Sequence, residues 1–242
     1  PFKGLFTQGM VCHETYKDQN NNWVSPDEIM NINGEKYLKN DETQKIKVGS
    51  SESMSKSKKN TIDPEKIIND YGADSVRLFI LSDSPPEKDV QWSNEGISSS
   101  YKFIQKLWGL HLKIMEQINM DLEVKENDIK IEKFTNQFIK NINDNLENFG
   151  YNKIIANIHQ MYTTLNKEMT NKHSKEVLKI NYSKILICIT PIIPHFSSQC
   201  LQELNIVKRD WPTYNQDYIL NEKVDYVIQI NGKKRALIRA KR

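Results

Sequence analysis

Residues 54–64 read MSKSKKNTIDP, a short cationic tract that runs directly into the start of a helix. Asp63 is a suitable N-cap, because its carboxylate can accept a backbone N–H of the first turn, and Pro64 fits the first helical position. Beyond Pro64 apolar residues recur at helical spacing up to Gly72, a residue that often ends a helix. The stretch therefore predicts a loop followed by a short helix.

The loop combines hydroxyl and ammonium groups. Ser55 and Ser57 offer hydroxyls, and Lys56, Lys58 and Lys59 offer point charges on long stems. Such a set suits the phosphates of a polyphosphate ligand. A solvated surface loop is the alternative, because charge runs are usually solvated. The residues that flank the loop have to decide between the two.

Helical spacing dominates the rest of the chain up to about residue 205. A second short helix ends before Pro85, and a long amphipathic helix begins after Ser93, a good N-cap. Its expected apolar stripe is Ile97, Tyr101, Ile104, Leu107, Trp108, Leu112, Met115 and Ile118. Further helices are expected over about 129–149, 151–169 and 174–204, the last split by Pro191 and Pro194. The pattern predicts an antiparallel helical bundle.

Strands are expected at the two ends. Residues 1–53 hold short apolar pieces between turn residues, with Asn33-Gly34 as a hairpin turn. Apolar and polar residues alternate over 224–230, and after Asn231-Gly232 an apolar stretch resumes, which predicts a second hairpin. A two-stranded hairpin is marginal alone, so it either packs on the bundle or begins a larger domain. The fold class is mainly α, with a small mixed α/β segment around the loop, a helical bundle and a C-terminal β-hairpin.

The chain has 242 residues and a formal net charge of +3, since 34 basic and 31 acidic residues nearly cancel. Six basic residues fall among the last ten: Lys233, Lys234, Arg235, Arg239, Lys241 and Arg242. No acid interrupts them, so they are either a contact surface for a phosphate backbone or a solubilising tail. Lys233, Lys234, Arg235 and Arg239 are the candidate nucleic-acid contacts.

The cysteines and histidines of the sequence give little support to disulfides, a metal site or histidine-based catalysis. Three cysteines, Cys12, Cys188 and Cys200, are odd in number and far apart, so we expect neither a disulfide framework nor a bound metal. No continuous apolar stretch approaches the length of a membrane span. The protein is expected in the reducing cytoplasm. The five histidines lack an evident partner in sequence, which favours surface or core roles for His13, His111, His159, His173 and His195.

Several stretches together resemble one family. They are FTQGMV (6–11), WVSPDE (23–28), MSKSKKN (54–60), YGADSVRLFIL (71–81) and SPPEKDVQWS (84–93). On these residues the chain resembles the C-terminal part of bacterial-type leucyl-tRNA synthetases, a family of class I aminoacyl-tRNA ligases. The loop is similar to the class I KMSKS loop, although Ser53 stands where the signature has its first lysine. The signature's second lysine is present as Lys56.

The resemblance implies the activity of a longer enzyme, of which this chain is expected to be a fragment. Leucine would be activated by ATP with Mg²⁺ and then transferred to tRNA(Leu). Lys56 is the expected catalytic residue, since a lysine on a loop can meet the charge that develops on departing pyrophosphate. Ser55, Ser57 and Lys58 are expected to bind the ATP phosphates together with Lys56.

The family also implies a division of the chain. Residues 1–92 would end the catalytic domain, 93–205 would form a tRNA-binding bundle, and 206–242 would link to a truncated C-terminal α/β domain. The expected partners are tRNA(Leu), ATP, leucine and the N-terminal catalytic half of the same chain. The complete protein is expected to be a monomer in the cytoplasm that does not associate with a membrane. Two alternatives stay open at this point: an RNA-binding module without ligase activity, and another class I synthetase for methionine, valine or isoleucine.

Overall fold

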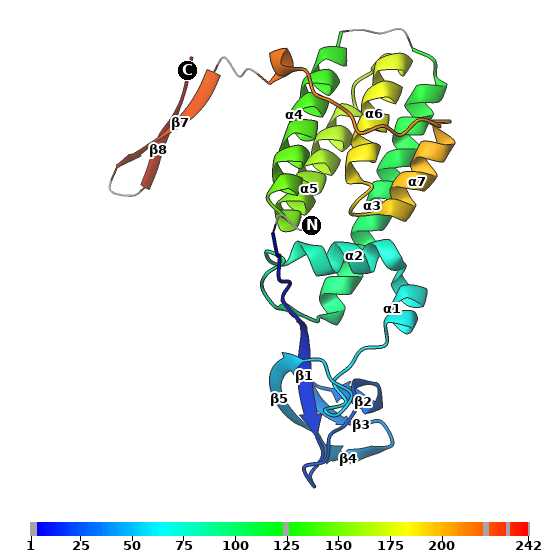
Figure 1. Ribbon diagram of the computed structural model, residues 1–242, viewed down its shortest axis with the longest axis vertical. Coiled ribbons are helices and arrows are strands. Elements are labelled where there is room, and N and C mark those ends of the chain that lie inside the picture. The colour runs from blue at the N-terminus through cyan, green and yellow to red at the C-terminus, as the bar shows by residue number, and fades with distance from the viewer. Residues whose placement is uncertain (1–3, 123–125, 220–222, 231–232, 242) are drawn as a thin grey trace.

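The computed structural model describes residues 4–122, 126–219, 223–230 and 233–241 (Figure 1). It shows a β-rich end, a helical bundle and a C-terminal hairpin that stands apart from the bundle. Helices make up most of the regular structure, as the helical spacing of apolar residues in the sequence predicts. The mainly α class is therefore confirmed.

The β-rich end contains two three-stranded sheets. The first has the order β5-β1-β6, with β1 antiparallel to β5 and parallel to β6. The second has the order β2-β3-β4 and is antiparallel. The elements are β1 (Val11–Lys17), the 3₁₀ turn η1 (Pro26–Glu28), β2 (Ile29–Ile32), β3 (Glu35–Leu38), β4 (Asp41–Lys45), β5 (Lys47–Ser53) and β6 (Val90–Gln91). A small core of Tyr16, Val24 and Ile46 joins the two sheets.

The turn between β2 and β3 is the one that the sequence predicts. Asn33 has φ +53° and Gly34 has φ +87°. Two consecutive residues with positive φ match the twist of the flanking strands, and Asn-Gly is the pair that adopts this conformation most easily. The predicted hairpin is confirmed.

Two short helices follow the cationic loop, α1 (Pro64–Tyr71) and α2 (Ala73–Ser82). The carboxylate of Asp63 accepts the backbone N–H of Glu65 at 3.0 Å, which caps α1 as predicted. Gly72 separates the two helices with φ +79° and ψ 151°, a conformation that a residue with a Cβ rarely adopts. Glycine is therefore required at the break.

Five helices form the bundle: α3 (Asn94–Asn119), α4 (Asp128–Glu147), α5 (Tyr151–Glu168), α6 (Lys175–Ile189) and α7 (Pro194–Glu203). Ser93 caps α3 by accepting the N–H of Gly96 at 3.1 Å. Pro191 and Pro194 divide the last predicted helix into α6 and α7, with Pro194 in the first turn of α7. The predicted break is confirmed.

The core of the bundle is aliphatic, and one part of the predicted α3 stripe is wrong. Ile97 and Leu107 of that stripe are buried, but Leu112 is 52% exposed and Tyr101 is 37% exposed. At about 100° per residue, Leu112 lies about 140° around the helix from Leu107, away from the packed face. Phe103, Leu110 and Ile114 fill the face instead, because α3 packs against α1, α2, α5, α6 and α7.

The C-terminal part contains the 3₁₀ turn η2 (Gln216–Tyr218) and an antiparallel hairpin of β7 (Lys223–Ile230) and β8 (Lys233–Lys241). This confirms the predicted hairpin strands. The predicted Asn231-Gly232 turn lies outside the described residues. Val227, Ile228, Leu237 and Ile238 are all exposed, so the described side chains do not form a closed core.

Candidate functional site

The cationic loop, residues 54–60, joins the end of β5 to α1. Its backbone starts with a hydrogen bond from the N–H of Met54 to the carbonyl oxygen of Val11 at 3.3 Å. Residues 56–59 form a turn, closed by the N–H of Lys59 donating to the carbonyl oxygen of Lys56 at 3.2 Å. The side chains of Lys56 and Ser57 are exposed at this turn. The loop therefore presents its charge to solvent and not to the core.

The predicted phosphate-binding residues lie together in this turn. The hydroxyls of Ser55 and Ser57 are 2.9 Å apart, and Ser55 Oγ accepts the N–H of Lys58 at 3.3 Å. These contacts hold the two hydroxyls on one side of the turn with Lys56 between them in sequence. An ammonium and two hydroxyls next to one another form a suitable donor set for phosphate oxygens.

The two candidate lysines differ in electrostatic environment. Lys58 Nζ forms an ion pair with Glu52 on β5, and this partner holds the pKa of the Glu52 carboxyl below its usual value. Among the described residues no carboxylate pairs with Lys56. Of Lys56 and Lys58, Lys56 is therefore the lysine whose ammonium is available to a ligand in this conformation.

Asn60 and Glu52 are site residues that the sequence reasoning missed. Asn60 is fully buried, and its side-chain oxygen accepts the N–H of Ser55 at 2.8 Å. Asparagine in a polar loop is usually interpreted as a turn residue, so its position gave no indication of a buried role. The six-residue separation of Glu52 and Lys58 likewise matches no local pairing rule.

A polar hollow of about 590 Å³ lies beside the loop. His13, Glu14 and Lys36 contribute to its lining, and the carbonyl oxygen of His13 accepts a hydrogen bond from Asn60 at 3.2 Å. Glu14 and Lys36 are ion-paired, which holds the pKa of the Glu14 carboxyl below its usual value. The His13 pKa is lowered, mainly because burial disfavours the charged ring. The hollow is therefore lined by side chains of both charge signs and is not a cluster of one sign.

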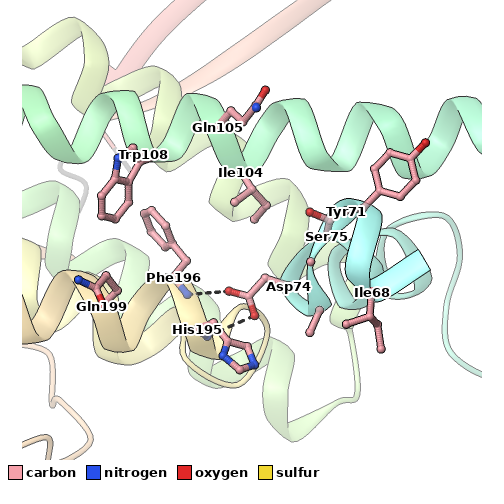
Figure 2. A pocket seen from close by; sticks show the side chains of 12 residues that line it. Ile68, Tyr71, Asp74, Ser75, Ile104, Gln105, Trp108, His195, Phe196 and Gln199 are labelled. Atoms are coloured by element: carbon pink, nitrogen blue, oxygen red, sulfur yellow. Dashed lines mark hydrogen bonds between the residues drawn. The ribbon is translucent and has the colours of Figure 1, made fainter. Parts of the chain in front are cut away.

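A larger and more apolar cavity, about 710 Å³, lies where α1 and α2 meet α3 and α7 (Figure 2). Tyr71 and Trp108 lie on two of its sides. The buried carboxylate of Asp74 accepts the backbone N–H groups of His195 at 3.2 Å and Phe196 at 2.7 Å, which caps α7 (Figure 2). The cavity contains no residue of loop 54–60, so it is separate from the phosphate-binding set.

The basic residues of the hairpin are not brought to the loop. Lys234 and Arg235 on β8 are exposed, and they lie where the register with β7 shifts between Ile228 and Gln229. Lys233 and Arg239 also belong to β8, but their side chains lie outside the described set. The hairpin and the β-rich end are well separated in Figure 1.

The prediction that the histidines lack partners is wrong for two of them. His111 is fully buried; its Nε2 lies 2.8 Å from a carboxylate oxygen of Glu203, and its Nδ1 lies 3.2 Å from the hydroxyl of Tyr182. His173 is also fully buried, 3.8 Å from Asp128. Because these partners lie 92 and 45 residues away, the sequence gave no sign of them. Both histidines are packed in the bundle, as the core interpretation predicts.

Three further observations concern other kinds of site. In the described ranges, no group of three or more His, Cys, Asp or Glu side chains is arranged to hold a metal ion. No helix in the part that the structure describes is long and apolar enough to cross a bilayer. Cys12, Cys188 and Cys200 are buried free thiols.

Comparison with protein families gives two matches. Residues 43–93, which include the loop, match the tRNA synthetases class I (I, L, M and V), and residues 128–242 match the anticodon-binding domain of tRNA ligase. The two matches fall on the loop region and on most of the bundle. They therefore assign both parts of the chain to one group of proteins.

Individual relatives give the same result. The chain is 40% identical over 246 residues to the leucine-tRNA ligase of Orientia tsutsugamushi, which covers 98% of this chain and 28% of that protein. It is 37% identical over 245 residues to the leucine-tRNA ligase of Wolbachia pipientis subsp. Culex pipiens, with 99% and 29% covered. The chain therefore spans less than a third of the length of these curated relatives.

A solved structure is similar in fold. It is the LeuRS-tRNA-LeuAMS ternary complex from Agrobacterium radiobacter K84, with a TM-score of 0.65, 24% identity, and coverage of 78% of this chain and 25% of that one. The similarity supports the fold of the chain.

Proposed function

We propose that the chain supplies the ATP loop and the tRNA-docking bundle of a leucine-tRNA ligase, because residues 43–93 match the class I tRNA synthetases, residues 128–242 match the anticodon-binding domain of tRNA ligase, and nearly the whole chain is similar to leucine-tRNA ligases. The observation that carries the proposal is the exposed turn of loop 54–60, where Lys56 has no carboxylate partner among the described residues. The complete enzyme acts as a monomer in the cytoplasm, where tRNA is charged.

The proposed chemistry starts with leucine and ATP. The leucine carboxylate attacks the α-phosphorus, the bond from that phosphorus to the bridging oxygen breaks, and pyrophosphate leaves with the electron pair. Negative charge grows on pyrophosphate during this step. An ammonium at Lys56 that approaches the leaving group stabilises the transition state more than the ground state, which increases kcat. Ser55, Ser57 and Lys58 donate to the remaining phosphate oxygens.

Magnesium enters this reaction with ATP as part of the substrate. Loop 54–60 offers ammonium and hydroxyl groups, and the carboxylate of Glu52 beside it is paired with Lys58. Such a set fits phosphate oxygens better than a divalent cation, which prefers carboxylate and water oxygens. The loop therefore contacts the nucleotide and leaves the metal to other groups.

We assign the three parts of the chain as follows. Residues 1–92 complete the catalytic domain, and 93–205 form the bundle that docks tRNA(Leu). Residues 206–242 lead into a C-terminal domain, in which Lys233, Lys234, Arg235 and Arg239 contact the RNA backbone. The family match over residues 128–242 supports the second assignment. In the second step of the reaction, the leucyl group moves to the 3′-terminal adenosine of the bound tRNA.

Lys56→Ala in the full-length protein tests the role of the loop. Leucine-dependent ATP–pyrophosphate exchange is expected to fall by about 10²-fold or more, the usual effect of removing one transition-state donor, while tRNA binding is retained. Lys66→Ala on α1 is the matched control, because this lysine is exposed close to the loop and has only a surface partner, Asp27. Unchanged exchange in the Lys56 variant would remove this residue from catalysis.

The substrate assignment has its own test. The full-length protein is assayed with each amino acid and purified tRNA in turn, and only leucine with tRNA(Leu) is expected to give a charged product. Charging of a methionine, valine or isoleucine pair would assign the protein to another class I enzyme. Absence of all charging, with tRNA binding intact, would favour the RNA-binding module.

A further inference from the structure

The side chain of Asn60 joins the two ends of loop 54–60. Its side-chain oxygen accepts the N–H of Ser55 at 2.8 Å, so the last residue of the loop is joined to the second. Its side-chain nitrogen donates to the carbonyl oxygens of His13 and Glu52, each at 3.2 Å. One amide therefore connects the loop to both β1 and β5.

The two carbonyl groups belong to a single strand pair. His13 on β1 and Glu52 on β5 are directly opposite one another in the antiparallel register. The Asn60 amide thus sits at the end of that ladder and fixes the loop relative to the sheet. The side chain is fully buried, so water does not compete for these bonds.

The position of Lys56 depends on this connection. Ser55, which Asn60 holds, immediately precedes Lys56, and the turn over 56–59 has only short-range bonds of its own. Apart from this amide, the described loop is joined to the strands by the N–H of Met54, which donates to the carbonyl oxygen of Val11 at 3.3 Å, and by the Lys58–Glu52 ion pair, and neither of these contacts involves Ser55 or Lys56. A misplacement of about 1 Å at a catalytic group can reduce a rate by about 10²-fold.

We propose that Asn60 is the positioning residue of the loop: it sets where the Lys56 ammonium stands during adenylate formation and does not itself touch ATP. This inference rests on the proposed function of the loop. The residue type is specific to the task, because an amide both accepts from Ser55 and donates to two carbonyl groups. Aspartate would keep the acceptor, lose both donations and place a charge against two carbonyl oxygens.

The test uses the full-length enzyme and two matched variants. Asn60→Ala removes the amide at the loop, and Asn136→Ala removes a buried amide in the bundle. The Asn136 side chain donates to the carbonyl oxygen of Glu132 at 2.8 Å and accepts the N–H of Asn215 at 2.6 Å. Each change removes a buried side-chain amide that both donates to and accepts from the backbone, so a loss of thermal stability is expected in both variants. Only the first is expected to affect the loop.

The expected result is a split between the two steps of the reaction. Asn60→Ala lowers kcat for ATP–pyrophosphate exchange by about 10- to 100-fold, with little change in the KM for leucine. Single-turnover transfer from enzyme-bound leucyl-adenylate to tRNA stays near the wild-type rate, because pyrophosphate has already left. Asn136→Ala keeps both rates. Trypsin also cleaves after Lys56, Lys58 or Lys59 faster in the Asn60 variant than in the control.

A double variant separates positioning from simple destabilisation. Because Asn60 acts through Lys56, Asn60→Ala is expected to add little to the loss already caused by Lys56→Ala. Multiplied losses, an equal loss of exchange in Asn136→Ala, or a wild-type exchange rate in Asn60→Ala would each overturn the inference. If Lys56→Ala itself leaves exchange unchanged, the proposed function of the loop fails first.

Discussion

Arg77 and Pro191 lie 114 residues apart, and the guanidinium of the first donates to the backbone carbonyl oxygen of the second at 2.7 Å. The same side chain donates to the carbonyl oxygen of Ile192 at 3.0 Å. On the same helix, Asp74 caps α7. Helix α2 therefore holds the α6–α7 break from both sides, and this connects the loop region to the bundle.

Replacement of Arg77 by methionine is expected to destabilise the chain by about 1–3 kcal/mol, because two carbonyl groups lose their charged donor while most of the apolar stem is kept. Urea unfolding of the 242-residue chain measures the difference. Arg209→Met is the control, since Arg209 makes one contact of 3.3 Å with Ser198 at an exposed position. Equal effects of the two changes would show that the tie to Pro191 contributes no specific stability.

Glu52 is expected to compete with ATP for Lys58. The ion pair occupies the ammonium that the phosphates would need, and both side chains are partly exposed. Glu52→Gln in the full-length enzyme should therefore lower the KM for ATP by about two- to fivefold, a size that fits a surface pair. The effect should shrink at high salt, because screening weakens the same attraction.

Glu42→Gln is the control for this change, because Glu42 is an exposed carboxylate on β4 of the same region. It alters the net charge equally and is expected to leave the KM for ATP unchanged. If the KM for ATP decreases equally in both variants, the effect comes from the overall charge of the protein and not from the Glu52–Lys58 ion pair. A higher KM in Glu52→Gln would mean that the pair holds Lys58 where ATP needs it.

Local signals predicted the parts of the fold that depend on neighbours in sequence. Asp63 and Ser93 cap helices because their side chains reach the first turn, and Pro194 starts α7 because it has no N–H to lose. Asn33-Gly34 makes a hairpin because both residues tolerate positive φ. Each of these effects acts within a few residues, so the sequence alone could indicate it.

The contacts that organise the loop are not local. Asn60 reaches His13 across 47 residues, and His111 reaches Glu203 across 92. No spacing rule connects such positions. The exposure of Leu112 shows the same limit, because the packed face of α3 is determined by five other helices. The hydroxyl and ammonium groups of the loop are evident in the sequence, whereas the contacts of Asn60 are evident only in the structure.

The two bundle cysteines give a prediction about pH. Burial raises the pKa of the Cys188 thiol to about 12 and that of the Cys200 thiol to about 12, from 9.0 for a free thiol. Below about pH 9 both states are protonated and the stabilising contribution is complete. Between pH 9 and 12 the unfolded chain loses the protons first, so stability falls as pH rises through this range.

Urea midpoints at a series of alkaline pH values measure this loss. A variant with both Cys188→Ala and Cys200→Ala is expected to show a smaller decline. At about pH 8, iodoacetamide should label the two thiols only when the chain unfolds, because the thiolate is the reactive form. Rapid labelling of the folded chain would show that these side chains are reached without unfolding.

Lys234 and Arg235 give the prediction for the hairpin. The double change Lys234→Ala and Arg235→Ala in the full-length enzyme is expected to weaken tRNA binding similarly for all tRNAs, because contacts to phosphates carry no sequence information. The slope of log affinity against log salt concentration should become less steep by about one to two units. ATP–pyrophosphate exchange should be unchanged, since this step needs no contact with the hairpin. A change confined to tRNA(Leu) would instead indicate base recognition, and an unchanged slope would mean that these residues only solubilise the chain.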